Sequence, residues 1–426
     1  MKVLVLGSGA REHALVKAIA ADPEVEAVIA APGNPGIDAT ALCVPVDLLD
    51  GEAVAALARE HAVDLVVIGP EAPLVAGVAD VCRSAGFPVV GPSAAAAQLE
   101  GSKSFAKEVM AAADVPTARA LVCTTMKQVE SALDALGAPH VVKDDGLAAG
   151  KGVVVTDSMD EALEHARACL SKEGGCLVVE EYLDGPEVSV FCLSDGTTVV
   201  PLQPAQDFKR VGDGDAGLNT GGMGAYSPLD WAPKTLVADV VERVAQPTID
   251  ELRHRGTPFI GILYVGLALT SRGPRVVEFN ARLGDPDGQA VLARLETPFA
   301  QLLHATATGT LADFPDLRWS SDAAVVVVIA SAGYPASPRT GDPISGLDAA
   351  AEVPGVVVLH AGTKLDEQGT LVSAGGRVLD VVAVGTDLAK ARSAAYRAVE
   401  LIELEGSHHR TDIALKAERG EITVGV

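Results

Sequence analysis

The motif RVVEFNARLGDPDGQ contains two side chains that could bind a metal ion. Glu278 and Asn280 are two residues apart in a run typical of a β-strand, so both side chains should point to one face. Hard oxygen donors at this spacing suit Mg²⁺ that bridges phosphates, with Mn²⁺ left open as a substitute. Arg282 follows at the same spacing and could contact a phosphate. The motif predicts a metal and phosphate site, with a purely structural Glu-Asn-Arg network as the alternative.

A glycine-rich loop lies in the stretch VVKDDGLAAGKGV, where Lys143 closes a predicted strand. Backbone amides of such a loop can surround a polyphosphate. The stretch is not a Walker loop, because Gly rather than Ser or Thr follows Lys151. Lys103, in GSKSFAK, would add a second positive charge. The two lysines would lie on opposite walls of a cleft between a small lid and a larger sheet. Either lysine alone would be read as a solvated surface charge, but together they predict a nucleotide site with the loop glycines Gly146, Gly150 and Gly152.

The stretch VVEEYLDGPE presents three carboxylates around a turn. Glu187 could bridge the hydroxyls of a ribose, and Glu180 could accept from the exocyclic amine of a base, with Glu181 beside it. Glutamates on a surface turn are more often simply solvated. The segment therefore supports a nucleotide site only in combination with the lysines.

The polar segment from Gln206 to Ser227 is too long for a mere connection, and such loops usually serve a site. Its charged side chains could hold small zwitterionic or anionic substrates, and its glycines offer free amides. The candidates are Asp207, Lys209, Arg210, Asn219, Gly221 and Gly222.

The opening GSGAREH places a Gly-x-Gly turn after a first apolar run. Glu12 stands where a dinucleotide fingerprint needs its third glycine, and the second strand lacks the acidic residue that would hold a ribose. A nicotinamide cofactor is therefore not expected. The turn, at the residues Gly7, Gly9, Ala10 and Arg11, could still hold the phosphate of a sugar phosphate; a tight turn without a ligand is the alternative.

The elements that position these residues have the order of an α/β and α+β multidomain protein. Apolar runs alternate with amphipathic helices over residues 1–103, which predicts a doubly wound parallel sheet. A second domain, 104–320, should contain a small lid at about 122–187 and an antiparallel sheet that faces it. Residues 321–426 suggest a smaller α+β domain.

Composition excludes several classes of protein. The formal net charge is -24 and no basic stripe is present, so nucleic acid is not an expected partner. No apolar run reaches the length of a membrane span. The six cysteines form no C-x-x-C pair, and reduced thiols are expected. These features predict a cytoplasmic protein.

Taken together, the motifs resemble the phosphoribosylamine-glycine ligases, also called glycinamide ribonucleotide synthetases, a family of the ATP-grasp superfamily. The resemblance runs from MKVLVLGSGAREHAL through IGPEAPLVAG, QLEGSKSFAK, QDFKRVGDGD and NTGGMGAYSP to HAGTK and GGRVL. NTGGMGAYSP is the most specific of these strings.

The resemblance implies an N-terminal sugar-phosphate domain, an ATP-grasp domain with its lid, and a C-terminal domain. It assigns ATP phosphates to Lys103 and Lys143, adenine to Glu180 and Leu183, and the nucleotide ribose to Glu187. Glu278 and Asn280 would hold the metal. Glu71 and Asp285 are expected on the substrate side, and the expected catalytic residues are Arg282, Lys143 and Asp207.

The implied reaction is ATP-dependent ligation of glycine to phosphoribosylamine through glycyl phosphate, a step of purine synthesis. Such chemistry needs positioning and charge neutralisation more than a nucleophile. The alternatives are a different ATP-grasp carboxylate-amine ligase or carboxylase, and a non-catalytic nucleotide-binding regulator. A monomer or weak homodimer is expected.

The sequence departs from the family pattern in four places. Asp144 stands where alanine is common, Phe208 where histidine is common, and GDPDGQ replaces GDPETQ. Leu283 replaces an aromatic residue. Asp144 would add negative charge beside the phosphate loop and would alter the contacts of that loop.

Overall fold

The N-terminal part of the chain forms a five-stranded parallel sheet in this computed structural model, which describes residues 1–147 and 152–424. The spatial order is β3 (Leu42–Cys43), β2 (Ala27–Pro32), β1 (Lys2–Gly7), β4 (Leu65–Ile68) and β5 (Val89–Val90). The helices are α1 (Ala10–Ala20), α2 (Gly51–Glu60), α3 (Glu71–Val75), α4 (Val78–Ser84) and α5 (Ala94–Gly101). The expected doubly wound parallel sheet is confirmed.

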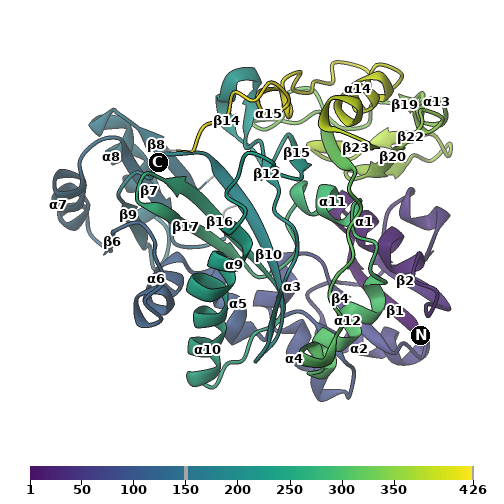
Figure 1. The fold of residues 1–426 in the computed structure, drawn as a ribbon, viewed down its shortest axis with the longest axis horizontal. Helices are drawn as coiled ribbons and strands as arrows, with labels where there is room; N and C mark the ends of the chain where they lie inside the picture. The colour runs from purple at the N-terminus through teal and green to yellow at the C-terminus, as the bar shows by residue number, and fades with distance from the viewer. Residues whose placement is uncertain (148–151, 425–426) are drawn as a thin grey trace.

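A small antiparallel sheet with two helices forms the lid, on the left in Figure 1. Its strand order is β6 (Ala120–Cys123), β9 (Leu177–Glu180), β7 (His140–Asp144) and β8 (Val153–Thr156). Helix α6 (Lys103–Ala112) leads into it, and α7 (Met126–Leu136) and α8 (Met159–Leu170) share a separate small hydrophobic core with the sheet. The lid is thus a folded unit of its own.

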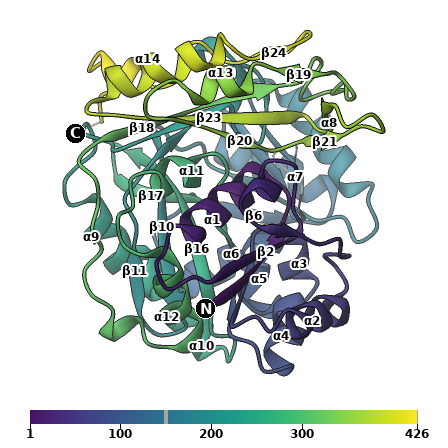
Figure 2. The same cartoon turned by 90° about the vertical axis from the view of Figure 1, so that its right-hand side faces the viewer.

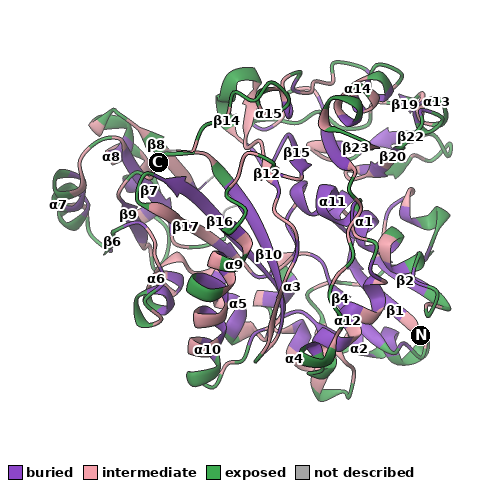
Figure 3. Ribbon diagram, in the orientation of Figure 1, coloured by how far each residue is buried: buried purple, intermediate pink, exposed green. Residues whose placement is uncertain are grey.

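The sheet that faces the lid is antiparallel, as the sequence predicted. Its order is β11 (Val199–Pro201), β10 (Glu187–Asp195), β16 (Ile260–Thr270) and β17 (Gly273–Asn280). Strand β16 is apolar and almost wholly buried (Figure 3), and it contacts helix α12 and strand β5 outside its own sheet. The accompanying helices are α9 (Leu236–Val240), α10 (Gln246–His254), α11 (Asp287–Leu292) and α12 (Phe299–Thr308).

The C-terminal sheet includes two strands from the middle of the chain. Its order is β12 (Gln206–Asp207), β15 (Gly224–Ser227), β18 (Ala323–Ala330), β23 (Arg377–Gly385) and β20 (Val356–His360). The segment expected as one long loop is therefore made of short strands, with a hairpin of β13 (Arg210–Gly212) and β14 (Ala216–Asn219) between them. Strands of two to four residues leave too little periodicity to be recognised in a sequence.

The remaining C-terminal elements surround this sheet, at the top of Figure 2. They are β19 (Ile344–Ser345), α13 (Leu347–Ala351), β21 (Thr363–Leu365), β22 (Leu371–Ser373), α14 (Leu388–Val399), β24 (Glu403–Leu404) and α15 (Leu415–Glu418). In the described part of the chain, no helix is long and apolar enough to cross a membrane.

Candidate active site

The end of strand β17 places Glu278 and Asn280 on one face, as their spacing predicted. The pairing of β17 with β16 shifts by one residue at Val277, so Val276 lies opposite Leu267 and Glu278 opposite Gly266. Such a bulge releases a backbone group from the ladder. The carbonyl of Val277 accepts from Lys143 Nζ at 2.9 Å, which brings the lysine of the lid to the predicted metal ligands.

Lys209 is held between two carboxylates of this site. Its Nζ lies 2.8 Å from Glu187 Oε2 and 3.3 Å from Glu278 Oε1. Lys209 is the main cause that lowers the pKa of Glu278 to about 2, against the opposing effect of burial. Burial lowers the pKa of Lys209 itself, but Glu187 and Glu278 raise it well above its usual range. The pair is therefore ionised at neutral pH, and Glu278 offers charged oxygens.

Glu180 lies between two lysines beneath the lid. Lys143 Nζ is 2.9 Å from one carboxylate oxygen and Lys107 Nζ is 3.1 Å from the other. Burial lowers the pKa of Lys107, and Glu180 opposes this effect. Lys107 was missed in the sequence, although it follows Lys103 by one helical turn in GSKSFAK. Each carboxylate oxygen of Glu180 already contacts a lysine. A hydrogen bond from adenine would therefore have to use an oxygen that also accepts from a lysine.

Lys103 lies at the start of α6, beside the glycine-rich loop. Its Nζ donates to the carbonyl of Gly146 at 3.0 Å, and its backbone N–H donates to the carbonyl of Asp145 at 3.2 Å. Burial lowers the pKa of Lys103, and Glu278 partly restores it. Lys103 thus faces the same site as Lys143. The predicted phosphate contacts at Gly150 and Lys151 lie outside the described residues.

Asp144 faces away from Lys143. Consecutive residues on a strand point to opposite faces, and the Asp144 carboxylate forms an ion pair with Lys172, just beyond α8. Its backbone N–H donates to the carbonyl of Gly152 at 2.8 Å, which anchors the far end of the loop. The negative charge of Asp144 is therefore paired on the other side of the strand.

The turn after β9 carries two further candidates. Glu181 accepts from the backbone N–H of Arg119 at 3.0 Å and lies 3.5 Å from Arg272, so its carboxylate joins two neighbouring segments instead of pointing at the lysines. Leu183 is partly exposed. The side chain of Glu187, at the start of β10, is 48 % exposed and so remains accessible to a ribose.

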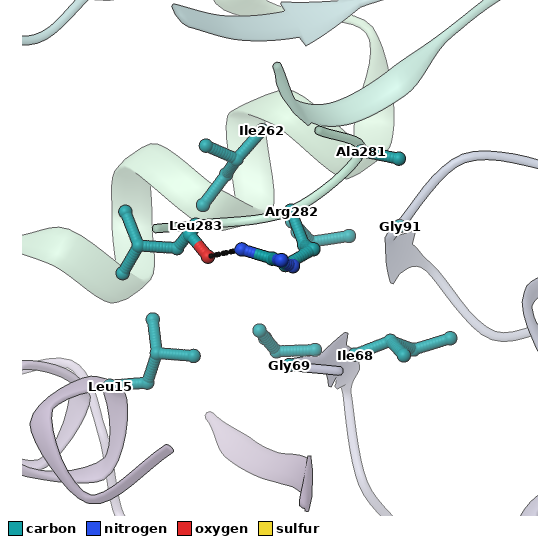
Figure 4. Close-up of a pocket in the computed structure, with 10 residues that line it drawn as sticks. Leu15, Ile68, Gly69, Gly91, Ile262, Ala281, Arg282 and Leu283 are labelled. Atoms are coloured by element: carbon teal, nitrogen blue, oxygen red, sulfur yellow. Dashed lines mark hydrogen bonds between the residues drawn. The ribbon is translucent and has the colours of Figure 1, made fainter. Parts of the chain in front are cut away.

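Arg282 lies where the N-terminal domain meets the central sheet. Its Nε is 3.2 Å from Glu71 Oε2 and its Nη2 is 3.0 Å from Glu100 Oε1. Burial lowers the pKa of Arg282, but Glu100 and Glu71 raise it above its already high value. Figure 4 shows the guanidinium bonded to the carbonyl of Leu283, beside a cavity of about 10 Å³ that also borders Gly69. Glu100 was missed in the sequence.

Glu12 fills the N-terminal Gly-x-Gly turn. Its Oε2 accepts from the backbone N–H of Gly9 at 2.7 Å, and its Oε1 lies 2.7 Å from Arg11 Nε. A Cβ on Gly7 would lie 2.5 Å from the Glu12 side chain. The Gly9 amide, one of those predicted to bind a phosphate, therefore already donates to Glu12. Ala10 follows it as the first residue of α1. Arg11 also reaches the carbonyl of Leu283 at 3.4 Å.

The segment 206–219 contributes Asp207 and Lys209 to the site. Burial, more than any other cause, raises the pKa of Asp207 to about 7; Lys209 opposes this, and the carboxylates of Asp287 and Glu187 add to it. Arg210 instead donates to the carbonyl of Gly217 at 2.9 Å within its own hairpin. The structure thus brings Asp207 and Lys209 close to the carboxylates of Glu187 and Glu278, whereas Arg210 lies outside this group.

Arg377 from the C-terminal domain holds the glycine turn that follows Asn219. It donates to the carbonyl of Gly221 at 2.7 Å and pairs with Asp285 at 2.9 Å. A Cβ on Gly222, whose φ is +114°, would lie 2.3 Å from Pro286. The turn and Asp285 are thus joined by an arginine that the sequence did not single out, although it lies in GGRVL.

The residues present suit a Mg²⁺ ion held jointly with phosphates. The hydrogen-bond network assigns the Asn280 amide nitrogen to the side of Glu100, so the amide oxygen faces away from that carboxylate. An ionised Glu278 and an amide oxygen on one face are the hard ligands that Mg²⁺ uses in small number beside phosphate oxygens. No cluster of three His, Cys, Asp or Glu that could hold a metal occurs among residues 1–147 and 152–424.

A lid and an antiparallel sheet with lysines and oxygen ligands between them define an ATP-grasp enzyme. Family models match the chain as the N domain of phosphoribosylglycinamide synthetase at residues 1–100, its ATP-grasp (A) domain at 101–288 and its C domain at 324–416. The chain belongs to the phosphoribosylamine-glycine ligase family, and the expected ATP-dependent ligase class is confirmed.

Relatives named phosphoribosylamine-glycine ligase cover the whole chain. The protein of Streptomyces coelicolor is 64% identical, covering 98% of this chain and 99% of the relative. That of Mycobacterium tuberculosis is 55% identical over 100% of both chains. The crystal structure of the Thermotoga maritima ligase is 32% identical with a TM-score of 0.83, covering 97% of this chain and 100% of that one.

The fold is also shared by a more distant enzyme. The biotin carboxylase domain of the Hydrogenobacter thermophilus 2-oxoglutarate carboxylase, solved with MgADP, is 17% identical with a TM-score of 0.74, covering 100% of this chain and 96% of that one. At this identity the likeness establishes the fold alone.

Proposed function

We propose that this enzyme activates glycine with ATP and joins it to phosphoribosylamine, giving glycinamide ribonucleotide, ADP and phosphate. The observation that carries the proposal is the convergence of Lys103, Lys143 and Lys209 on Glu278, with Arg282 two residues beyond Asn280. Four cations beside two oxygen ligands suit a polyphosphate with its metal.

The nucleotide is assigned to the space between the lid and the central sheet. Lys103 and Lys143 contact its phosphates, together with the amides of the glycine-rich loop, and Glu187 holds the ribose. The adenine lies near Glu180 and Leu183. The place of Glu180 and Glu187 at the two ends of the turn that connects lid and sheet supports this assignment.

The phosphoribosylamine is assigned to the N-terminal domain. Gly7, Ala10 and Arg11 lie at the carboxyl end of β1, where ligands of parallel sheets bind. Glu71 begins α3, after the neighbouring strand β4, and its pairing with Arg282 links this side to the ATP-grasp domain. Asp207, Lys209 and Asp285 are assigned to the glycine side of the site.

Glu278 and Asn280 would hold Mg²⁺, which when bound neutralises charge on the ATP phosphates; Mn²⁺ is proposed as a substitute. The carboxylate of glycine attacks the γ-phosphorus and ADP leaves, giving glycyl phosphate. The amine of phosphoribosylamine then attacks the acyl carbon and phosphate leaves. Arg282 steadies the transferred phosphoryl group, and the glycine-rich loop excludes water from the acyl phosphate. The protein supplies orientation and positive charge throughout.

Release of ADP from purified protein tests this reaction. ATP and Mg²⁺ are supplied with glycine, with freshly generated phosphoribosylamine, and with both. Turnover only with both supports the proposal. Turnover with glycine alone, or with another amino acid, would support the alternative hypothesis of a different carboxylate-amine ligase. ATP binding with no turnover under any condition would indicate a non-catalytic nucleotide-binding protein.

The metal assignment has its own test. Glu278→Gln removes the charged ligand at nearly constant volume, so turnover should fall sharply and require more Mg²⁺. Glu242→Gln, on an exposed helical segment away from the cluster, is the matched control. A Glu278→Gln enzyme with unchanged turnover and unchanged Mg²⁺ dependence would disprove the assignment.

We also propose a cytoplasmic location and a monomer or weak homodimer. The six cysteines, all in the described part of the chain, are free thiols, which suits a reducing compartment. Sedimentation velocity over a range of concentrations would determine the association state.

A further inference from the structure

Glu100, near the end of α5, contacts three consecutive residues of the proposed active site. Its Oε2 accepts from the backbone N–H of Ala281 at 2.7 Å, and its Oε1 lies 3.0 Å from Arg282 Nη2. With the Asn280 amide oriented so that its nitrogen meets the neighbouring acceptors, that nitrogen lies 3.3 Å from the same Oε1. The side chain is only 7% exposed, so water does not compete freely for these contacts.

These contacts require a carboxylate. A backbone N–H, an amide nitrogen and a guanidinium are all donors, and an ionised Glu accepts from several donors at once. A glutamine would turn its own NH₂ toward one of them. The charge of Arg282 is thus balanced by a buried partner on one side and by Glu71 on the other.

The orientation of Asn280 depends on this carboxylate. With its nitrogen bound to Glu100 and to the carbonyl of Phe279 at 3.0 Å, the side-chain oxygen faces away from Glu100. This is the oxygen that a metal ion would use. Partners of this kind fix the rotamers of metal ligands, and their loss typically costs about 10–100-fold in metal affinity or activity.

We infer that Glu100 is a positioning residue that orients Asn280 toward the metal and Arg282 toward the transferred phosphoryl group. The inference rests on the proposed function for the roles of those two residues. Glu100 itself does not touch the reacting atoms. It lies in α5, the last helix before the ATP-grasp domain. A residue of the N-terminal part of the chain thus orients the proposed metal ligand Asn280 at the end of β17.

The test compares Glu100→Gln with wild type and with Glu108→Gln, an exposed glutamate on the adjacent helix α6. Binding of Mn²⁺ is measured by electron paramagnetic resonance with a non-hydrolysable ATP analogue. Glu100→Gln should weaken Mn²⁺ binding about tenfold and lower kcat more than it changes the KM for ATP. Glu108→Gln should leave both unchanged.

Thermal unfolding separates this role from simple packing. If Glu100→Gln lowers the melting temperature but leaves the Mn²⁺ dissociation constant within twofold of wild type, the inference is wrong. Glu100→Asp, which keeps the charge but shortens its reach, should give a smaller loss of Mn²⁺ affinity and serves if Glu100→Gln does not fold. Because Mn²⁺ binding needs neither glycine nor phosphoribosylamine, failure of the proposed substrates would not be mistaken for failure of this inference.

Discussion

Lys143 and Asp144 are adjacent in the sequence but face opposite sides of β7. Lys143 points into the cleft, toward Glu180 and the carbonyl of Val277. Asp144 points toward the end of α8 and pairs with Lys172, whose side chain is 62% exposed. Because side chains alternate along a strand, the charge that Asp144 adds lies on the face of β7 opposite to the one that carries Lys143.

Asp144→Ala should consequently have little effect on nucleotide binding. We expect the dissociation constant of an ATP analogue, measured by calorimetry, to change by less than about twofold, since the removed charge lies on the far face and is paired with Lys172. Lys143→Met is the comparison, because it removes the charge that faces the cleft and should weaken binding strongly. A large loss of affinity in Asp144→Ala would show that the acid acts on the loop after all.

Residue spacing predicted which neighbouring side chains of one strand share a face. Glu278 and Asn280 share a face because they are two residues apart. Glu100 and Arg377 could not be found this way, since their partners at 280–282 and 285 are distant in the sequence. Lys107 was within reach, because it lies on the helix of Lys103. The sequence therefore indicates ligands, but not the side chains that hold them.

The β13–β14 hairpin is fixed by a residue near the end of the C-terminal domain. Arg410 is fully buried and pairs with Asp215 at 2.8 Å and with Asp412 at 2.7 Å. Its guanidinium lies 4.8 Å from the ring centre of Phe208, which stands where the family commonly has histidine. The hairpin follows Lys209 directly, so this arginine also secures the backbone that carries Lys209.

Arg410→Met should loosen this hairpin. Breaking a buried ion pair costs about 3–5 kcal/mol, and we expect about 2 kcal/mol here because Asp215 is more than half exposed and can be hydrated. Urea unfolding measures the loss, and limited proteolysis should cut near Gly214 sooner than in wild type. Arg410→Lys should be destabilised as well, since lysine lacks the planar fork, whereas Arg419→Lys on the surface should not. Unchanged proteolysis in Arg410→Met would contradict the idea.

Long elements were predictable and short ones were not. The runs at β1, β16 and β18 are apolar over several residues, and their type follows from burial on both faces. The strands β12 and β15 have two and four residues, and a polar, glycine-rich sequence surrounds them. Strand β15 pairs with β18, far along the chain, and β12 pairs with β15. The pairing with β18 has no local signal.

At the scale of the whole molecule, a buried polar network joins the ATP-grasp and C-terminal domains. Gln289 donates to Asp285 at 2.8 Å and to Asp380 at 2.9 Å, and Arg377 pairs with Asp285. Burial, and then the charge of Asp285, raise the pKa of Asp380 from 3.8 to about 7. The contact between the domains therefore includes an acid that gains charge near neutral pH.

This acid gives the stability a defined pH dependence. The folded protein keeps the proton of Asp380 up to about pH 7, whereas the unfolded chain releases it near pH 3.8, so Asp380 makes the fold less stable as pH rises through this window. Asp380→Asn cannot titrate. Its free energy of unfolding relative to wild type should increase by at least about 1.4 kcal/mol between pH 4 and pH 8, the equivalent of one pKa unit.

Chemical unfolding at the two pH values measures this difference. Asp348→Asn, an exposed acid of the same domain, should show no such trend. A constant offset between Asp380→Asn and wild type at all pH values would mean that Asp380 is already ionised in the folded protein.

The shared C-terminal sheet has a consequence for the synthesis of the chain. Strand β15 and the β13–β14 hairpin leave the ribosome long before β18, Arg377 and Arg410, which fix them. Domains usually fold in order as they emerge, so a nascent chain can complete its N-terminal sheet while the turn at Gly221 still lacks its partners. The turn at Gly221 and the β13–β14 hairpin can therefore reach their final contacts only after Arg377 and Arg410 have been synthesised.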